Sequence, residues 1–70
     1  MTKKELIAAN IADIRARCGP GAIISVRKAA DYLGKDPRTL MADTAFPLIR
    51  IGKSQKVPVV GLAAWLSEGV

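Results

Sequence analysis

Histidine is absent from this 70-residue sequence, and cysteine occurs once, at Cys18. The lack of histidine and of a second thiol excludes the usual zinc sites and any disulfide framework within the chain. One cysteine without a histidine to act as its base also argues against nucleophilic catalysis, and there is no glycine-rich phosphate loop. We therefore expect a protein that is not an enzyme, holds no metal and no cofactor, and works in a reducing, intracellular compartment.

Aromatic residues are also scarce, because the chain has one phenylalanine, one tryptophan and one tyrosine. With so little aromatic area available, Phe46 and Trp65 are expected in the core rather than on a surface that stacks bases. Tyr32 either packs or directs its hydroxyl at a phosphate. No apolar run reaches the length of a membrane span, and charges interrupt the N-terminal stretch, so neither a membrane partner nor a signal peptide is expected.

Acidic residues are in the minority, with six against eleven basic residues, which gives a net charge of +5. Between Arg27 and Lys56, seven basic residues stand against three acidic ones, so most of the excess lies in the middle of the chain. An excess of this kind is the electrostatic footprint of a nucleic-acid-binding protein.

The first segment, residues 2–18, has the pattern of an amphipathic helix. Thr2 and Glu5 form a T-x-x-E capping box, and the glycines and proline at 19–21 end the helix. The residues at helical spacing on its apolar face are Ile7, Ile11, Ile14 and Cys18. Two roles fit this helix: it packs on its own domain, which we favour, or it docks on a neighbouring molecule and makes a dimer or a filament.

Two short helices are predicted next. Ser25 is a suitable N-cap for a helix that ends at Gly34. Asp36-Pro37 then starts a second helix, which runs to about residue 42. Its inward residues are expected to be Leu40 and Met41. Two short helices joined by a tight turn that contains glycine are the signature of a helix-turn-helix.

The stretch FPLIRIGKSQKVPVV, residues 46–60, predicts a two-stranded β-hairpin. Its turn is expected at residues 52–55, between a strand around Arg50 and a returning strand at 56–59. Pro58 is tolerated only on an edge strand or at a strand end, which fits a hairpin without a third strand. A closing helix over residues 60–67 presents Leu62, Trp65 and Leu66, and a short extended segment precedes the first of the two short helices at residues 23–24.

The order of these elements resembles the small winged-helix DNA-binding domains of the phage excisionase family, which are related to the MerR fold. The resemblance covers residues 23–66, and the matching positions are Ala29, Ala30, Leu33, Gly34, Arg38, Thr39, Pro47, Arg50, Ile51, Gly52, Leu62 and Trp65. The chain departs from the family at Arg27 and Lys28, where an acidic residue is usual, in its short loop after the second helix, and in its additional N-terminal helix.

Together with the N-terminal helix read from its own residues, the resemblance predicts a single α+β, mostly helical domain over residues 1–70. It would be a winged helix-turn-helix at 23–67, with a two-stranded β-hairpin wing and a closing C-terminal helix, preceded by the extra helix at 2–18.

Ten residues make up the predicted DNA-binding site: Arg27, Lys28, Lys35, Arg38, Thr39, Arg50, Lys53, Ser54, Gln55 and Lys56. Arg38 and Thr39 open the second helix, whose first turn enters the major groove in a helix-turn-helix, where arginine can pair with guanine. Arg27 and Lys28 open the first helix, where cations oppose the helix dipole and a bound phosphate would compensate them. Lys35, in the turn, fits a contact with the DNA backbone.

The polar stretch at the hairpin tip, residues 53–56, has two interpretations. As the wing of a winged helix, it contacts the DNA backbone or the adjacent minor groove. As a solvated turn, its lysines only protect an exposed strand edge from aggregation. For the hairpin tip, the combined pattern favours the contact with DNA. For Arg38, the alternative to a contact with DNA is that it only solvates an exposed face.

The resemblance implies sequence-specific binding of double-stranded DNA by a protein of a phage or other mobile element. It would act as an excisionase, which directs a partner integrase or recombinase toward excision, or as a transcriptional regulator. Self-association on DNA or through the N-terminal helix fits either role, and the expected location is the cytoplasm of a bacterial host, on the nucleoid when bound. The alternative is a protein-interaction module that uses the N-terminal amphipathic helix and binds no DNA.

Overall fold

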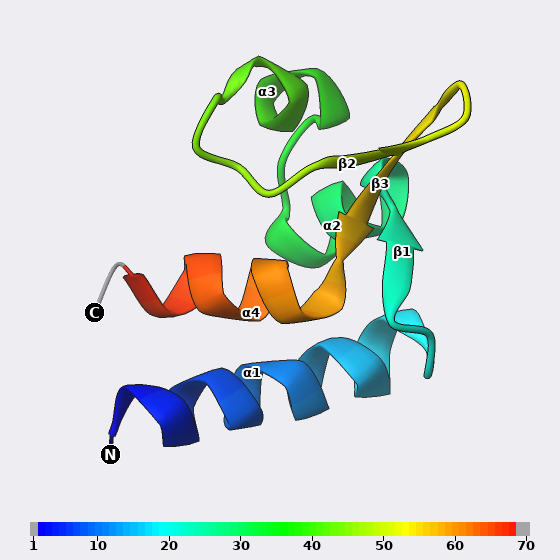
Figure 1. Cartoon of the computed structure of the whole chain (residues 1–70). Coiled ribbons are helices and arrows are strands. Elements are labelled where there is room, and N and C mark those ends of the chain that lie inside the picture. The colour runs from blue at the N-terminus through cyan, green and yellow to red at the C-terminus, as the bar shows by residue number, and fades with distance from the viewer. Residues whose placement is uncertain (1, 69–70) are drawn as a thin grey trace.

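Four helices and a three-stranded antiparallel sheet make up the computed structural model, which describes residues 2–68 (Figure 1). In chain order the elements are α1 (Lys3–Cys18), β1 (Ile23–Ser25), α2 (Val26–Leu33), α3 (Pro37–Ala42), β2 (Ile49–Ile51), β3 (Ser54–Pro58) and α4 (Val59–Glu68). The predicted class, α+β and mostly helical, is confirmed at this level.

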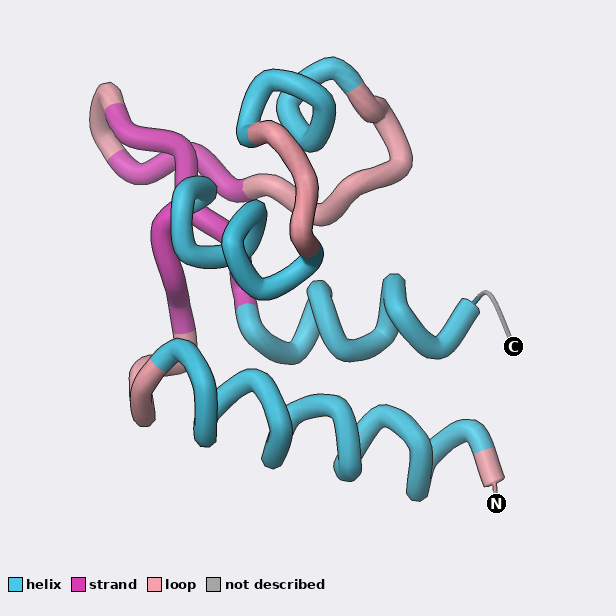
Figure 2. The backbone as a smooth tube through the Cα atoms, turned by 180° about the vertical axis from the view of Figure 1, so that it is seen from behind, coloured by secondary structure: helices cyan, strands magenta, loops and turns pink. Residues whose placement is uncertain are grey.

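Helix α1 begins with the predicted capping box. The Thr2 hydroxyl accepts a hydrogen bond from the Glu5 amide at 3.2 Å, and the Glu5 carboxylate accepts one from the Thr2 amide at 3.3 Å. The helix then runs antiparallel to α4 and beside it, so that the start of α1 and the end of α4 lie at the same end of the molecule (Figures 1 and 2). The helix therefore packs on its own chain, which is the role favoured from its sequence.

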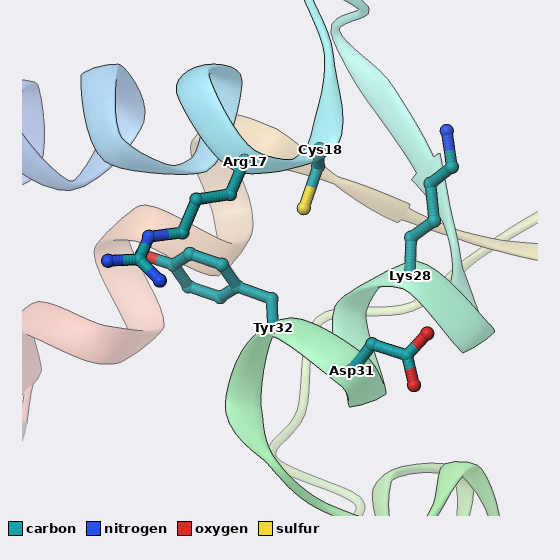
Figure 3. Close-up of a pocket in the computed structure, with 5 residues that line it drawn as sticks. All are labelled: Arg17, Cys18, Lys28, Asp31 and Tyr32. Carbon is teal, nitrogen blue, oxygen red and sulfur yellow. The ribbon is translucent and has the colours of Figure 1, made fainter.

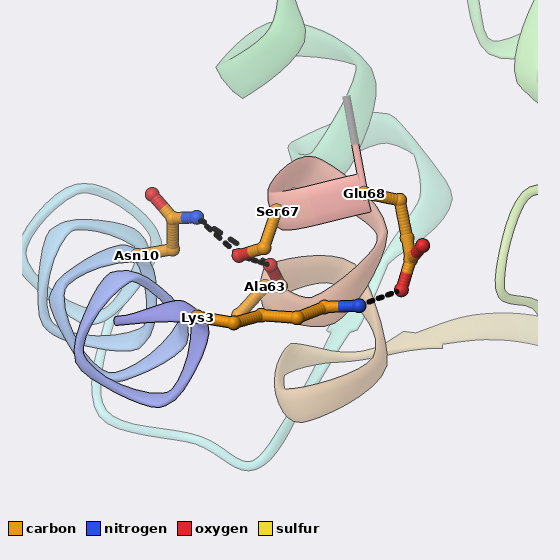
Figure 4. Close-up of polar contacts among 5 residues, drawn as sticks. All are labelled: Lys3, Asn10, Ala63, Ser67 and Glu68. Carbon is orange, nitrogen blue, oxygen red and sulfur yellow. Dashed lines mark hydrogen bonds and ion pairs between the residues drawn. The ribbon is translucent and has the colours of Figure 1, made fainter. Parts of the chain in front are cut away.

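The contact between α1 and α4 is mainly apolar. Ile14 of α1 and Leu62 of α4 are fully buried in the common core. At the polar edge of the contact, the Asn10 amide donates to the hydroxyl of buried Ser67 at 3.1 Å, and Ser67 donates to the Ala63 carbonyl at 2.8 Å (Figure 4). Ser67 is thus buried without an unsatisfied polar group, which would otherwise cost about 1–3 kcal/mol.

An ion pair also joins the outer ends of the two helices, between Lys3 Nζ and a Glu68 carboxylate oxygen 2.7 Å away (Figure 4). Both side chains are more than half exposed, and pairs of this kind contribute only about 0–1 kcal/mol. The apolar contact therefore holds α1 in place, and the ion pair adds little.

The sheet has the strand order β1-β3-β2, so β3 is central and β1 forms an edge. Ile24 pairs with Val57, and Ile49 pairs with Lys56. The prediction of a two-stranded hairpin without a third strand is therefore wrong, because the short extended segment at residues 23–24 is a strand that pairs with β3. Pro58 is tolerated in the central strand because it is the last residue of that strand.

The two faces of the sheet have different surroundings because side chains alternate along each strand. Ile24 and Val57 lie on the face that packs on the helices, and both are buried. The opposite face carries Ile23, Ile49 and Ile51, whose side chains are 36–51% exposed. We call this second surface the open face of the sheet.

Helices α2 and α3 begin and end at the predicted residues. Ser25 caps α2, Gly34 ends it with a left-handed φ of 69°, and Asp36 caps α3. The prediction that Leu40 and Met41 both face inward is wrong, because Leu40 is 3% exposed and Met41 is 45% exposed. Neighbouring residues of a helix point about 100° apart, and the short α3 has one face against the core.

Strand β3 continues directly into α4, one residue earlier than the predicted start at Val60. The Val59 amide donates to the Ala22 carbonyl at 2.9 Å, which extends the pairing of β1 and β3 into the first turn of the helix. Of the predicted apolar face of α4, Leu62 is fully buried and Trp65 and Leu66 pack against the core while partly buried. The buried positions also include Val59, Ala63 and Ser67, which were not predicted. Trp65 is partly buried and stands edge-on to buried Phe46, with ring centroids 5.1 Å apart.

Gly61 allows the close approach of α4 to the start and the end of the hairpin. A Cβ at this position would lie 2.9 Å from Pro58 Cγ and 3.2 Å from Pro47 Cβ. Both proline rings are stiff, so they cannot move aside as the end of a flexible side chain would. Because Gly61 has no side chain, α4 can pack this closely on both prolines and take the angle to β3 that is observed.

We predict that Gly61→Ala destabilises the protein, although the same change in an exposed helix stabilises by up to about 1 kcal/mol. Overlap with the two prolines should lower the free energy of unfolding by about 1–3 kcal/mol. Urea unfolding followed by the fluorescence of Trp65, the single tryptophan, measures this. Ala64→Gly, in the same helix, calibrates the ordinary propensity effect, and a raised urea midpoint for Gly61→Ala would contradict the close approach.

Candidate nucleic-acid interface

The ten predicted DNA-binding residues lie on the surface in three groups. Nine are exposed, and Lys56 is partly buried. The first group is on the hairpin of β2 and β3 and comprises Arg50, Lys53, Ser54, Gln55 and Lys56. The second is at the turn between α2 and α3 and comprises Lys35, Arg38 and Thr39, and the third, Arg27 and Lys28, is in the first turn of α2.

The hairpin turn is shorter than predicted. It consists of Gly52 and Lys53, whereas Ser54, Gln55 and Lys56 are paired residues of β3, so the prediction of a four-residue turn at 52–55 is wrong. Gly52 has a φ of +61°, and Lys53 does not have a positive φ. Glycine with positive φ at the first position is typical of a type II′ turn, whose twist matches that of the two strands. The hairpin is therefore narrow at its end, and Lys53 stands at the outermost point.

Alternation along the strands divides the hairpin residues between its two faces. Arg50 and Gln55 are directly opposite each other. They project from the same face as Val57, which packs on the helices closer to the core. Ser54 and Lys56 project from the open face. Lys56 also pairs with Ser25 of β1, so it lies in the middle of the sheet and not at the tip as predicted. The hairpin thus presents a cation on each face and one at its end.

No acidic residue occurs between Asp43 and Glu68, so the hairpin carries only positive charge. Five of the six acidic side chains bind partners outside the hairpin in the described chain: Glu5, Asp13, Asp36, Asp43 and Glu68. They cap helices, form a turn or pair with cations of α1 and α3. Among residues 2–68 the hairpin cations therefore form no ion pair with an acidic side chain, and their charge is available to an anionic ligand.

The turn between α2 and α3 places its cations in solvent. Lys35 and Gly34 both donate backbone hydrogen bonds to the Ala30 carbonyl, which closes the end of α2. Arg38 gives its backbone amide to the Asp36 carboxylate at 2.9 Å, while its guanidinium Nε is 3.6 Å from the same oxygen. The Arg38 side chain is 89% exposed, so this ion pair is weak and leaves the guanidinium accessible.

The start of α2 carries two cations and no acidic residue in its first turn, as predicted. Lys28 lies near Lys56 in space, because both line a groove of about 370 Å³ between the loop at residues 19–21 and the sheet. Local sequence patterns do not reveal this neighbourhood. It depends on the pairing of β1 with β3, which brings Ser25 opposite Lys56.

A separate hollow of about 300 Å³ lies between α1 and α2, with Arg17 and Tyr32 on one side and Lys28 and Asp31 on the other (Figure 3). The Tyr32 hydroxyl donates to one Asp13 carboxylate oxygen, and Arg17 Nε is 3.3 Å from the other. Of the two roles considered for Tyr32, its hydroxyl therefore binds Asp13 within the chain and does not point outward as a free phosphate ligand. This hydrogen bond joins α1 to α2.

The electrostatics of this contact are visible in two pKa shifts. Burial, and then the hydrogen bond to Asp13, raise the pKa of Tyr32 from 10.0 to about 12. The same hydrogen bond, assisted by Arg17, lowers the pKa of Asp13 below its ordinary value of 3.8, against a smaller opposing effect of burial. The neutral phenol and the charged carboxylate are thus the forms that stabilise the folded protein.

Comparison of the chain with models of known families, with curated proteins and with solved structures gives no match. Within residues 2–68, no helix combines the length and the apolar character needed to cross a membrane. The same residues bring together no cluster of three or more cysteine or carboxylate side chains that could hold a metal ion.

We predict that absorbance titration of Tyr32, the single tyrosine, has its midpoint near pH 12 in the folded protein. Because the folded pKa is raised, the stabilisation from Tyr32 is complete below about pH 10 and is lost as the pH rises toward 12. Because the Asp13 pKa is lowered, the contribution of Asp13 is present above its ordinary pKa and is lost as the pH falls through the folded value.

Asp13→Asn should lower the Tyr32 midpoint only part of the way to 10.0, because burial is the larger cause and remains. Asp31→Asn, which removes an acidic group on the other side of the same hollow, is the matched control and should leave the midpoint unchanged. An unchanged midpoint in Asp13→Asn would show that the carboxylate does not hold the phenol.

Proposed function

We propose that this chain is a small DNA-binding protein of the winged helix-turn-helix type that binds specific double-stranded sites. The observation that carries the proposal is the hairpin of β2 and β3, which is exposed, has no acidic residue and presents Arg50, Lys53 and Lys56. Phosphate contacts supply most of the affinity of DNA-binding proteins, and unneutralised lysine and arginine side chains are the groups that make them.

The two short helices support the same proposal. A three-residue turn, Gly34–Asp36, joins α2 to α3, and α3 opens with exposed Arg38 and Thr39. In a helix-turn-helix the N-terminal residues of the second helix contact base edges in the major groove. Arg38 is the side chain suited to pair with guanine there, at about 1–3 kcal/mol of discrimination against other bases.

The overall layout also favours one face for DNA. Helix α3 and the end of the hairpin both lie on the side of the molecule that faces away from α1 (Figures 1 and 2). The alternative, in which α1 docks on a protein partner, receives little support because Ile7, Ile11 and Ile14 already pack on the core of their own chain. Because α3 and the end of the hairpin lie on the same side, contacts from both would act on the same duplex.

The biological role follows from the resemblance to the excisionase family, and it is part of the proposal. A protein of a phage or mobile element with this DNA-binding surface would direct an integrase toward excision, regulate promoters of the element, or do both. Both roles need the same DNA contacts. Tandem binding with bending of the DNA favours the excisionase role, and overlap of the site with a promoter favours the regulatory one.

We predict salt-dependent binding to duplex DNA, measured by fluorescence anisotropy with a mixed-sequence duplex over a series of salt concentrations. The logarithm of the affinity should fall linearly with the logarithm of the salt concentration. Arg50→Ala/Lys53→Ala should flatten this slope by about 0.9 for each phosphate contact that is lost.

Lys4→Ala/Arg15→Ala is the matched control, because it removes the same charge from exposed positions of α1. Its slope should stay close to that of the unmodified protein. Absence of salt-dependent binding in the unmodified protein would overturn the proposal, and equal effects of the two double variants would show that net charge alone, and not the hairpin, determines binding.

A further inference from the structure

The end of the hairpin carries an apolar side chain that is half exposed and lies outside the core cluster. Ile51 immediately precedes the turn, and its side chain is 51% exposed. Its partner across the hairpin is the exposed hydroxyl residue Ser54. On the other face of the hairpin, the next pair is Arg50 and Gln55, and both are exposed. The core has therefore ended before this level of the hairpin is reached.

Folding does not require an isoleucine at this place. A β-branched residue suits a strand, but threonine has the same branching and would avoid exposing apolar area. Strand β2 is moreover an edge of the sheet, where polar or charged side chains usually prevent association of strands. Ile49, on the same strand and the same face but nearer the core, is less exposed at 36%. The exposed apolar area on β2 thus increases from Ile49 to Ile51, toward the tip.

We propose that Ile51 is an apolar wedge that inserts between base steps in the DNA minor groove and kinks the duplex. Proteins that bend DNA from the minor groove commonly insert isoleucine, leucine, phenylalanine, methionine or proline in this way, and they bind the flanking backbone with cations. The inference rests on the proposed function, because it names a residue that acts within the same DNA contact.

Charge and shape at the tip fit this occupant better than a second copy of the chain. Ile51 stands two positions before Lys53 of the turn, and Lys56 projects from the same face as Ile51, two positions beyond Ser54, whereas Arg50 projects from the opposite face. Two identical open faces placed against each other would bring the Lys56 side chains together. The phosphates on the two sides of a minor groove instead present negative charge on both sides of an inserted side chain.

The wedge acts as a determinant of specificity because base steps differ in the energy needed to unstack them. Pyrimidine–purine steps such as TpA are flexible and easily kinked, whereas A-tracts are stiff. A protein with a wedge therefore prefers a duplex that offers a TpA step at the point of insertion. The preference needs no hydrogen bond to a base and adds to any contact from α3.

The test uses two duplexes of equal length that differ in the central step, one with TpA and one within an A-tract. The full chain and Ile51→Thr are compared, because threonine keeps the branching that suits the strand and removes most of the apolar area. Affinity is measured by anisotropy, and unstacking is measured by the fluorescence of 2-aminopurine placed at the central step. Ile49→Thr, on the same strand and face, is the matched control.

The unmodified protein should bind the TpA duplex more tightly and raise the 2-aminopurine fluorescence. Ile51→Thr should lose about fivefold in affinity for the TpA duplex, the amount expected from burying about half of an isoleucine side chain, and should lose the fluorescence change. Its salt slope should be unchanged because no charge is removed. Ile49→Thr should keep both the preference and the fluorescence change.

If Ile51→Thr keeps the TpA preference and the fluorescence change, the wedge is overturned while salt-dependent DNA binding stands. If Ile49→Thr and Ile51→Thr lose affinity equally, the whole apolar strip and not a wedge is responsible, which also overturns the inference. If no duplex binds in a salt-dependent manner, both the wedge and the proposed function fail.

Discussion

The direct passage from β3 into α4 is the constraint on which the rest of the structure depends. Strand β3 is the central strand, so it pairs with both other strands, and α4 packs on α1. No loop separates them, and Gly61 lets the helix approach Pro47 and Pro58 closely. The direction of the hairpin is thereby set by a rigid base of two helices. A hairpin on a flexible linker would lack this fixed orientation and would lose more conformational entropy on binding.

The same arrangement leaves one surface of a small chain free of stabilising contacts. Apolar side chains of both α1 and α4 are used to complete a core that would be marginal in the remaining segment alone. Most acidic side chains cap helices, form turns or pair with nearby cations, so they do not neutralise the hairpin. Because these acidic side chains stabilise other parts of the molecule, the hairpin keeps its positive charge and the start of α3 stays exposed.

Features that depend on neighbouring residues could be predicted from the sequence, and features that depend on distant pairing could not. The capping box at Thr2, the cap at Asp36 and the end of α2 at Gly34 involve residues two to five apart, and all three were predicted correctly. Strand β1 is only three residues long, without a periodic pattern, and it exists because it pairs with residues more than thirty positions away. The shared groove of Lys28 and Lys56 follows from that pairing, so local patterns did not reveal it, whereas the length of the turn follows from the register of β2 and β3.

The most direct measurement for the proposed interface is an amide NMR titration of the folded protein with duplex DNA at low salt. The account predicts that the largest shifts occur in residues 49–56 and at the start of α3, residues 37–40, while the exposed face of α1 changes little. Shifts concentrated in α1 and α4, with the hairpin unaffected, would contradict it and would return attention to the first helix as the binding surface.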